Sequence, residues 1–240
     1  MKKIKCILLF AFFSSLITFS ACKKVTIEAH NASSIKIIDA SEYVPELTAN
    51  FSFSPIPFSQ WLGPNQGPVT YGTSVEFGKP SGSLPVVLIS SQDTLHPFYK
   101  NTLNLSAGGS YSLYVIGQNQ AETMLLKDEI PAFQDSTSGV RFVNLSPDSE
   151  PITINLQGNS PSQTEFTSLA YKQISDFKSY PAPITLKNYK FEIRDAATGT
   201  LLSTFTWTFK RFYCNTLVVY GLENDSFGNF PFGIFQVNHY

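Results

Sequence analysis

Apolar and polar residues alternate along short runs of this chain. The clearest run has Phe205, Trp207 and Phe209 alternating with Thr206 and Thr208. Such a two-residue period predicts a β-strand that buries one face. Short runs of this kind, separated by Gly, Pro, Asn and Ser, recur over most of the chain, and no segment keeps a helical period between capping residues. The pattern therefore predicts an all-β protein.

The strand pattern occurs twice. Val140–Asp148 is an apolar run that closes in a Ser-Pro-Asp turn, and Ile35–Ser41 is its weaker counterpart 105 residues earlier (140 − 35). An offset of this size is typical of a repeated domain. Further landmarks match in the same order: Val69–Phe77 with Leu169–Phe177 (pairing Tyr71 with Tyr171, Glu76 with Asp176 and Phe77 with Phe177), Val87–Ile89 with Phe191–Ile193, and Leu113–Gly117 with Leu217–Gly221.

The repeat predicts two tandem β-sandwich domains. Residues 27–127 form the first, which is the more divergent copy, and residues 139–240 form the second. Between them, residues 128–138 are mostly polar, contain Pro131 and end in small residues. This composition is typical of a short linker.

The N-terminus resembles the signal peptide of a bacterial lipoprotein. Three lysines precede a short apolar stretch, and Phe19-Ser20-Ala21-Cys22 then ends it with small residues directly before a cysteine. The apolar stretch is too short to favour a membrane span. The resemblance implies that residues 1–21 are removed, that Cys22 carries the lipid, and that residues 22–26 form a short tether.

The same resemblance predicts the location. No Asp follows Cys22, so the usual signal for retention in the inner membrane is missing, and we expect a lipid-anchored protein of the outer membrane. The sequence leaves open which leaflet carries the anchor. The membrane is thus the first expected partner.

Composition narrows the functional classes. The 240 residues carry a formal net charge of −1, and only 15 % are charged. Because the chain has no basic stripe, its electrostatics do not favour binding to nucleic acid. Once the leader cysteine and Cys22 are set aside, Cys214 is alone in the folded part, so neither a disulfide within a domain nor a cysteine metal site can form there. No cofactor is expected.

Three stretches of the second repeat resemble a known family. Arg141–Asp148, Leu169–Phe177 and Asp195–Thr200 are similar to the landmarks of the domain of unknown function family 4397, which occurs in secreted and lipid-anchored bacterial proteins. The resemblance implies immunoglobulin-like β-sandwiches, and it supplies no catalytic residues. Two departures are Leu145, which is bulkier than the family's usual residue, and Pro181-Ala182-Pro183, which lacks the usual glycine.

Candidate catalytic residues are dispersed. His30, His96 and His239 lie in different elements without metal-ligand spacing, so we expect exposed or locally hydrogen-bonded imidazoles. No Gly-x-Ser-x-Gly nucleophile motif occurs. Glu76 and Asp176 match between the repeats, which favours a structural role over an acid–base pair. The expectation is a protein that is not an enzyme.

The aromatic stretch Phe51–Leu62 is the main asymmetry between the repeats. It is broken by two prolines, so it predicts a loop at one end of the first sandwich. If it binds a ligand, Trp61 and Phe58 would supply ring faces, and Gln60 and Asn65 would supply polar contacts. Alternatively, these rings fold back and cap the sandwich core.

Three functional hypotheses follow. The first is a non-catalytic binding, adhesion or structural module at the cell surface, with another envelope protein as partner. The second is an accessory glycan-binding lipoprotein of a nutrient-capture system. The third, ranked last, is a hydrolase with dispersed carboxylates.

Overall fold

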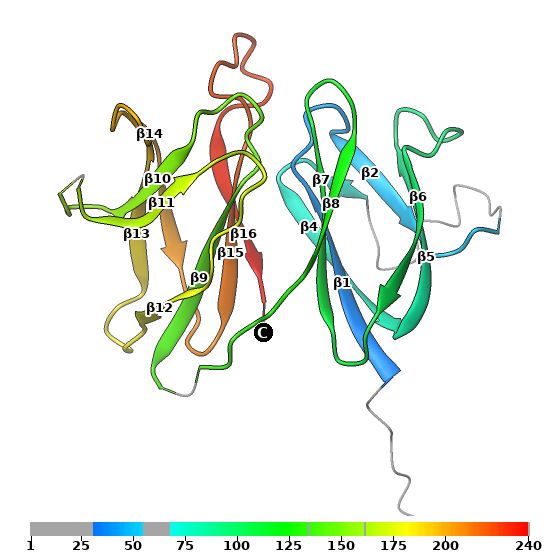
Figure 1. Ribbon diagram of the computed structural model, residues 1–240, viewed down its shortest axis with the longest axis horizontal. Coiled ribbons are helices and arrows are strands. Elements are labelled where there is room, and N and C mark those ends of the chain that lie inside the picture. Colours follow the sequence, from blue (N-terminus) through cyan, green and yellow to red (C-terminus); the bar gives the residue numbers. More distant parts are fainter. Residues whose placement is uncertain (1–30, 55–67, 134, 161, 240) are drawn as a thin grey trace, which may run out of the picture. The chain divides into compact units, whose positions relative to one another are not determined.

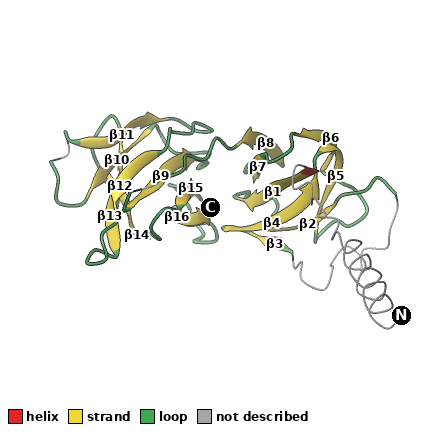
Figure 2. Cartoon of the chain, turned by 90° about the horizontal axis from the view of Figure 1, so that it is seen from below, coloured by secondary structure: helices red, strands yellow, loops and turns green. Residues whose placement is uncertain are grey.

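The computed structural model describes residues 31–54, 68–133, 135–160 and 162–239. Of these residues, 56 % lie in strands and 1 % in helices, which confirms the predicted all-β sandwich fold (Figures 1 and 2). Residues 31–240 form one compact unit.

Two four-stranded sheets make up the first sandwich. The strand order is β4-β1-β7-β8 in one sheet and β3-β2-β5-β6 in the other (Figure 1). The strands are β1 (Ala32–Asp39), β2 (Glu46–Asn50), β3 (Val69–Thr70), β4 (Thr73–Pro80), β5 (Gly82–Ser90), β6 (Tyr99–Leu105), β7 (Ser110–Ile116) and β8 (Glu122–Lys127).

The second sandwich repeats this order, with every strand number raised by eight. Its sheets are β12-β9-β15-β16 and β11-β10-β13-β14. The strands are β9 (Thr137–Asn144), β10 (Ile152–Leu156), β11 (Thr164–Leu169), β12 (Lys178–Pro181), β13 (Asn188–Asp195), β14 (Leu201–Thr208), β15 (Cys214–Tyr220) and β16 (Gly233–Asn238). Among the described residues, no strand of one sandwich pairs with a strand of the other.

Equivalent hydrogen bonds support the repeat residue by residue. The Gly72 N–H donates to the Asp39 carbonyl at 2.9 Å, and the Lys172 N–H donates to the Asn144 carbonyl at 2.7 Å. Gly72 and Lys172 both have positive φ angles, of 74° and 67°. The turn after β3 is therefore held against the end of β1 in the same way as the equivalent turn is held against the end of β9.

Two of the predicted alignments are wrong by one residue. Phe77 pairs with Ile35, whereas Val140, the equivalent of Ile35, pairs with Lys178, so Phe77 corresponds to Lys178 and not to Phe177. One extra residue lies between the Val143–Ile174 bridge and β12, because the register against β9 shifts by one residue between the bridge and the start of β12. A one-residue shift reverses the face of each side chain. Phe77 accordingly lies in the first core, whereas Phe177 contacts Arg141 outside the second core.

The second shifted alignment concerns β5 and β13. Leu84, Val86 and Leu88 face the first core, and Tyr189, Phe191 and Ile193 pack in the second, so the true offset is 105 residues. The predicted match of Val87 with Phe191 corresponds to an offset of 104 residues, which is one residue too few. Every second residue is apolar in both strands, and residues on both faces of β5 are buried, so the local pattern does not reveal the shift.

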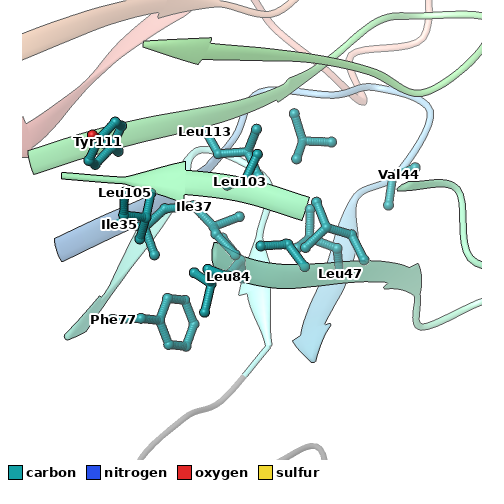
Figure 3. Close-up of a cluster of buried hydrophobic side chains, with 14 residues drawn as sticks. Ile35, Ile37, Val44, Leu47, Phe77, Leu84, Leu103, Leu105, Tyr111 and Leu113 are labelled. Carbon is teal, nitrogen blue, oxygen red and sulfur yellow. The ribbon is translucent and has the colours of Figure 1, made fainter. Parts of the chain in front are cut away.

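Each sandwich has its own core between its two sheets. In the first, Ile35, Ile37, Leu113 and Leu84 interdigitate in the cluster of Figure 3. In the second, Trp207 is completely buried among aromatic rings and its Nε1–H donates to the Asn215 Oδ1 at 2.8 Å. Trp207 is thus a core residue, as the alternating pattern predicted.

A third apolar cluster lies between the two sandwiches, and we call this contact the seam. It joins the sheet β4-β1-β7-β8 to the sheet β12-β9-β15-β16. Repeat-equivalent residues meet there: Ile38 and Val143, Ala40 and Leu145, Tyr114 and Val218. Both sheets are therefore covered on both faces, which explains why β1, β7, β9 and β15 are buried almost throughout.

The stretch between the sandwiches is more tightly held than a polar linker. Asp128 is 6 % exposed, and the Cys214 thiol donates to the Pro131 carbonyl at 3.4 Å. Phe133 lies where a Cβ on Gly139 would be, so this ring can only approach a glycine at that position. Strand β9 already begins at Thr137, two residues before the predicted start of the second domain.

Candidate functional site

The residues that the sequence nominated lie outside the described part of the chain. Cys22 belongs to residues 1–30, and Phe58, Gln60, Trp61 and Asn65 belong to residues 55–67. Their predicted roles stay predictions.

The described start of the aromatic stretch has two kinds of ring. Phe51 packs on the first core, with its ring 4.8 Å from that of Phe77, and the Lys79 ammonium lies 3.7 Å from the Phe51 centroid. Phe53 is 47 % exposed, with the Lys100 ammonium 5.3 Å from its centroid. Phe51 therefore caps the core, whereas Phe53 presents its ring to the surface.

A polar network runs through the seam. Asp128 pairs with the Arg141 guanidinium and accepts a hydrogen bond from the Ser112 hydroxyl at 2.8 Å. The Arg141 Nε–H donates to the Thr216 Oγ1 at 2.8 Å, and Thr216 bonds the His239 Nε2 at 2.7 Å. All five groups are buried. Buried charges of this kind need partners, and Asp128 and Arg141 satisfy each other.

One edge of the seam opens into a hollow of about 440 Å³, which we call the seam hollow. It lies between β4 of the first sandwich and the ends of β14, β15 and β16 of the second. Its walls carry amides, aromatic rings, a carboxylate, an ammonium and an imidazole. They are formed by Glu76, Thr208, Phe209, Lys210, Tyr213, Asn215, Gln236, Asn238 and His239.

A chain of amides is fixed to the core beneath the hollow. Trp207 donates to the Asn215 Oδ1, and the Asn215 Nδ2 donates to the Asn238 Oδ1, both at 2.8 Å. The Gln236 Nε2 also donates to the Asn238 Oδ1 at 2.8 Å. The Asn238 carbonyl oxygen thus accepts two bonds, and within the described residues its amide nitrogen and the Gln236 Oε1 have no protein partner. These groups are oriented in advance and can bond a ligand.

His239 adds a buried, neutral imidazole to the wall. Burial, together with the positive charges of Arg141 and Lys36, lowers its pKa to about 3. It is 3 % exposed, and its Nδ1 has no hydrogen-bond partner among the described residues. A buried polar atom without a partner is costly, so this atom points to a bound group or water in the hollow.

Charge in the hollow is nearly balanced. The Lys36 ammonium lies 3.1 Å from the Glu76 carboxylate, and the Lys210 ammonium lies 2.9 Å from the Tyr213 hydroxyl and over its ring. The walls thus offer hydrogen bonds and ring faces without a large net charge. This chemistry suits a neutral ligand rich in hydroxyl groups better than a phosphate or a polycation.

A larger hollow of about 600 Å³ is chemically poorer. It is lined mainly by serines, glycines and backbone around residues 32–34 and 106–110, with Lys127, Asp128 and Glu129 at one side. No aromatic ring enters its lining. We therefore place the candidate site at the seam hollow.

The described histidines differ from one another. His96 is exposed and its Nδ1 bonds Asp93 at 3.0 Å, as expected for a locally satisfied imidazole. His239 is buried in the seam, where its Nε2 bonds Thr216 and its Nδ1 has no partner among the described residues, so the expectation of a satisfied ring holds for only one of its two nitrogens. Sequence reasoning missed the site because Glu76 and Asn238 are 162 residues apart (238 − 76) and neither belongs to a motif.

Two further searches of the described residues gave negative results. No three His, Cys, Asp or Glu side chains in this part converge as metal ligands. None of its helices is long and apolar enough to cross a bilayer.

Comparison with known proteins gives only distant likenesses. No protein-family model matches the chain, and no curated protein matches it. Among solved structures, it is similar to the CBMbc module (family CBM26) of Eubacterium rectale Amy13K, solved with maltoheptaose, with a TM-score of 0.28 and 12 % identity over 86 % of this chain and 97 % of that one.

Two other solved structures give similar values. The multi-modular, glycogen-degrading pneumococcal virulence factor SpuA has a TM-score of 0.26 and 8 % identity over 87 % of this chain and 22 % of that one. A streptococcal virulence factor that binds α-glucan has a TM-score of 0.26 and 8 % identity over 85 % of this chain and 96 % of that one. Similarity at this level does not bear on the ligand of this chain.

Proposed function

We propose that this protein is a non-catalytic lipoprotein of the bacterial envelope that binds a carbohydrate in the seam hollow. The observation that carries the proposal is the amide chain from Trp207 to Asn238, which ends beside aromatic rings in amide groups that have no partner within the described part of the chain. Planar amides can bond neighbouring hydroxyl groups of a sugar, and ring faces can cover its apolar side. Both kinds of group are rigidly supported here, which favours binding.

The anchor is the other half of the proposal. Lipid on Cys22 would hold the protein at the outer membrane, and the short tether of residues 22–26 would keep the first sandwich near the lipid surface. Membership of the domain of unknown function family 4397 is part of the same proposal. If the hollow holds a side chain of another envelope protein instead of a sugar, the adhesion hypothesis applies.

Glycan binding is tested with an oligosaccharide array followed by calorimetry on the best ligand, with maltoheptaose among the probes. Asn238→Ala and Gln236→Ala should each weaken binding by roughly five- to tenfold, because one hydrogen bond is worth about 1 kcal/mol. Asn104→Ala is the matched control, since Asn104 is an exposed strand amide on β6, outside the hollow lining. Equal affinity of all three variants would reject the seam hollow as the binding site.

Trp61→Ala separates the hollow from the aromatic loop. If the loop is the binding surface, this variant should lose about 2 kcal/mol or more of binding energy at an unchanged melting temperature, while Asn238→Ala should bind normally. If no oligosaccharide binds the native protein, co-purification from the envelope tests the adhesion alternative.

The lipid anchor is tested independently. Cys22→Ser should abolish labelling by a radioactive fatty acid and release the protein from the membrane fraction. Normal labelling of that variant would disprove the anchor without affecting the binding proposal.

A further inference from the structure

Four buried oxygen atoms without hydrogen-bond partners among the described residues belong to three residues near the end of β1. They are the Asp39 Oδ2, both carboxylate oxygens of Glu42, and the Tyr71 hydroxyl. Asp39 is completely buried, and Glu42 is 7 % exposed. A buried carboxylate is strongly unfavourable unless it takes up a proton or pairs with a positive group, so these oxygens indicate one of the two.

The second repeat shows what a satisfied version looks like. Asn144 is the equivalent of Asp39, and its Oδ1 accepts from the Ser146 N–H at 3.1 Å, as the Asp39 Oδ1 accepts from the Ser41 N–H at 3.0 Å. The Asn144 Nδ2 donates to the Leu169 carbonyl and the Ser149 hydroxyl, both at 3.1 Å. Where Asn144 has its donating amide nitrogen, Asp39 has a second carboxylate oxygen, which is an acceptor.

The electrostatic surroundings are negative. Burial, with a smaller contribution from the Glu42 charge, raises the pKa of Asp39 to about 8, although the Ser41 N–H lowers it in part. Burial, with a smaller contribution from Asp148 of the second sandwich, raises the pKa of Glu42 to about 7, although the N–H groups of Glu42 and Gly221 lower it in part. Burial also raises the pKa of Tyr71, with contributions from Glu42 and Asp39.

The second sandwich closes over the group. The Tyr71 ring lies 4.9 Å from that of Tyr220 and 5.1 Å from that of Phe230. The Asp148 carboxylate, by contrast, is satisfied by the N–H groups of Glu223 at 2.8 Å and Asn224 at 3.0 Å. The unpartnered oxygens thus sit at the loop end of the seam, on rigid neighbours.

We propose that the carboxylates of Asp39 and Glu42, with the Tyr71 hydroxyl, bind a divalent cation, and that Ca²⁺ is the cation that fits. Oxygen is the only donor type offered, which favours Ca²⁺ or Mg²⁺ over zinc. Two carboxylates three residues apart with a neutral phenol form an irregular set, and Ca²⁺ accepts such sets by completing its shell with carbonyl oxygens and water, whereas Mg²⁺ demands near-octahedral geometry. The cation would join the loop ends of the two sandwiches.

The test uses the full chain and the metal alone. Melting temperature is measured in CaCl₂ and in EDTA, and terbium luminescence is measured with tyrosine excitation. For the native protein we expect a higher melting temperature in CaCl₂, because the cation binds only the folded state, and a terbium signal that CaCl₂ competes away. In Asp39→Asn and in Glu42→Gln, both responses should be lost.

Asp39→Asn is expected to fold, because the second repeat carries asparagine at this position. In EDTA it should be at least as stable as the native protein. Asp93→Asn is the control, since Asp93 is an exposed carboxylate beside His96; it should keep both responses. A melting temperature of the native protein that does not depend on CaCl₂, or equal terbium signals in the native and Asp39→Asn proteins, would overturn the proposal and indicate that the carboxyls are simply protonated.

Discussion

Lys36 and Arg141 occupy equivalent places in the two repeats and both are buried in the seam, where Arg141 pairs with a carboxylate from the other sandwich. Arg141 pairs with Asp128 of the first repeat, whereas Lys36 pairs with Glu76 of its own sheet. His239 is the counterpart of Asp128, since Asp128 and His239 donate their N–H groups to the equivalent carbonyls of Ser110 and Cys214. The seam is thus a repeated interface in which the Asp128 carboxylate of one repeat corresponds to the neutral His239 imidazole of the other.

Asp128→Asn should destabilise the protein by roughly 3–5 kcal/mol, because the Arg141 charge would remain buried without its counter-ion. The free energy of unfolding in guanidinium chloride measures this. Glu129→Gln is the control, since Glu129 forms only an exposed pair with Lys127, and this variant should behave as the native protein does. A loss below about 1 kcal/mol for Asp128→Asn would mean that water reaches Arg141.

Trp207→Ala should cost roughly 3–5 kcal/mol, because the ring is completely buried and packs against Tyr189, Phe191 and Phe209. It should also free the Asn215 Oδ1 and loosen the amide chain beneath the hollow. Trp207→Phe keeps most of the packing and loses the N–H, so it should destabilise less while still weakening glycan binding. Denaturant unfolding with calorimetry on both variants separates the two effects.

The strand positions could be predicted from the sequence because a strand that buries only one face alternates apolar and polar residues. Trp207 and its neighbours are the clearest case. The runs Ile35–Ile38 and Val140–Val143 also predict strands, and each contains a single cation, Lys36 or Arg141, in a strand that the structure buries on both faces. A charged residue within an otherwise continuous apolar strand needs a polar partner across an interface.

Register and the site could not be derived in this way. The extra residue before β12 leaves the apolar period intact over so short a strand, so Phe177 was matched with Phe77 although it faces Arg141. The seam hollow depends on how two sandwiches pack together. Its residues, such as Glu76 and Asn238, are ordinary strand residues that gain a role only from that contact.

The buried His239 should make stability depend on pH. Its pKa in the folded state is lowered to about 3, so between about 3 and the ordinary value of 6.5 the unfolded chain binds a proton that the folded protein excludes. Its contribution is fully present above pH 6.5 and is lost as the pH falls towards 3. The groups facing it are Thr216, Phe177, Arg141 and Lys36.

His239→Gln removes this titration. The slope of unfolding free energy against pH between 4 and 6 should therefore be smaller in the variant, by up to one proton. The variant is compared with the native protein at every pH, so that other titrating groups cancel. Identical slopes for His239→Gln and the native protein would show that the imidazole is protonated in the folded state.

The second sandwich expressed alone should form a dimer. Residues 135–240 contain both sheets and the whole second core, so we expect them to fold cooperatively. Separation from the first sandwich exposes Val143, Leu145 and Val218, which the seam buries. Because the seam joins equivalent faces of the two repeats, this face can pair with its own copy in the same manner.

Sedimentation velocity should show a dimer whose fraction rises with concentration, and Val218→Glu should keep the fragment monomeric and folded. A native fragment that stays monomeric at all concentrations would mean that the seam is specific to the two unlike repeats.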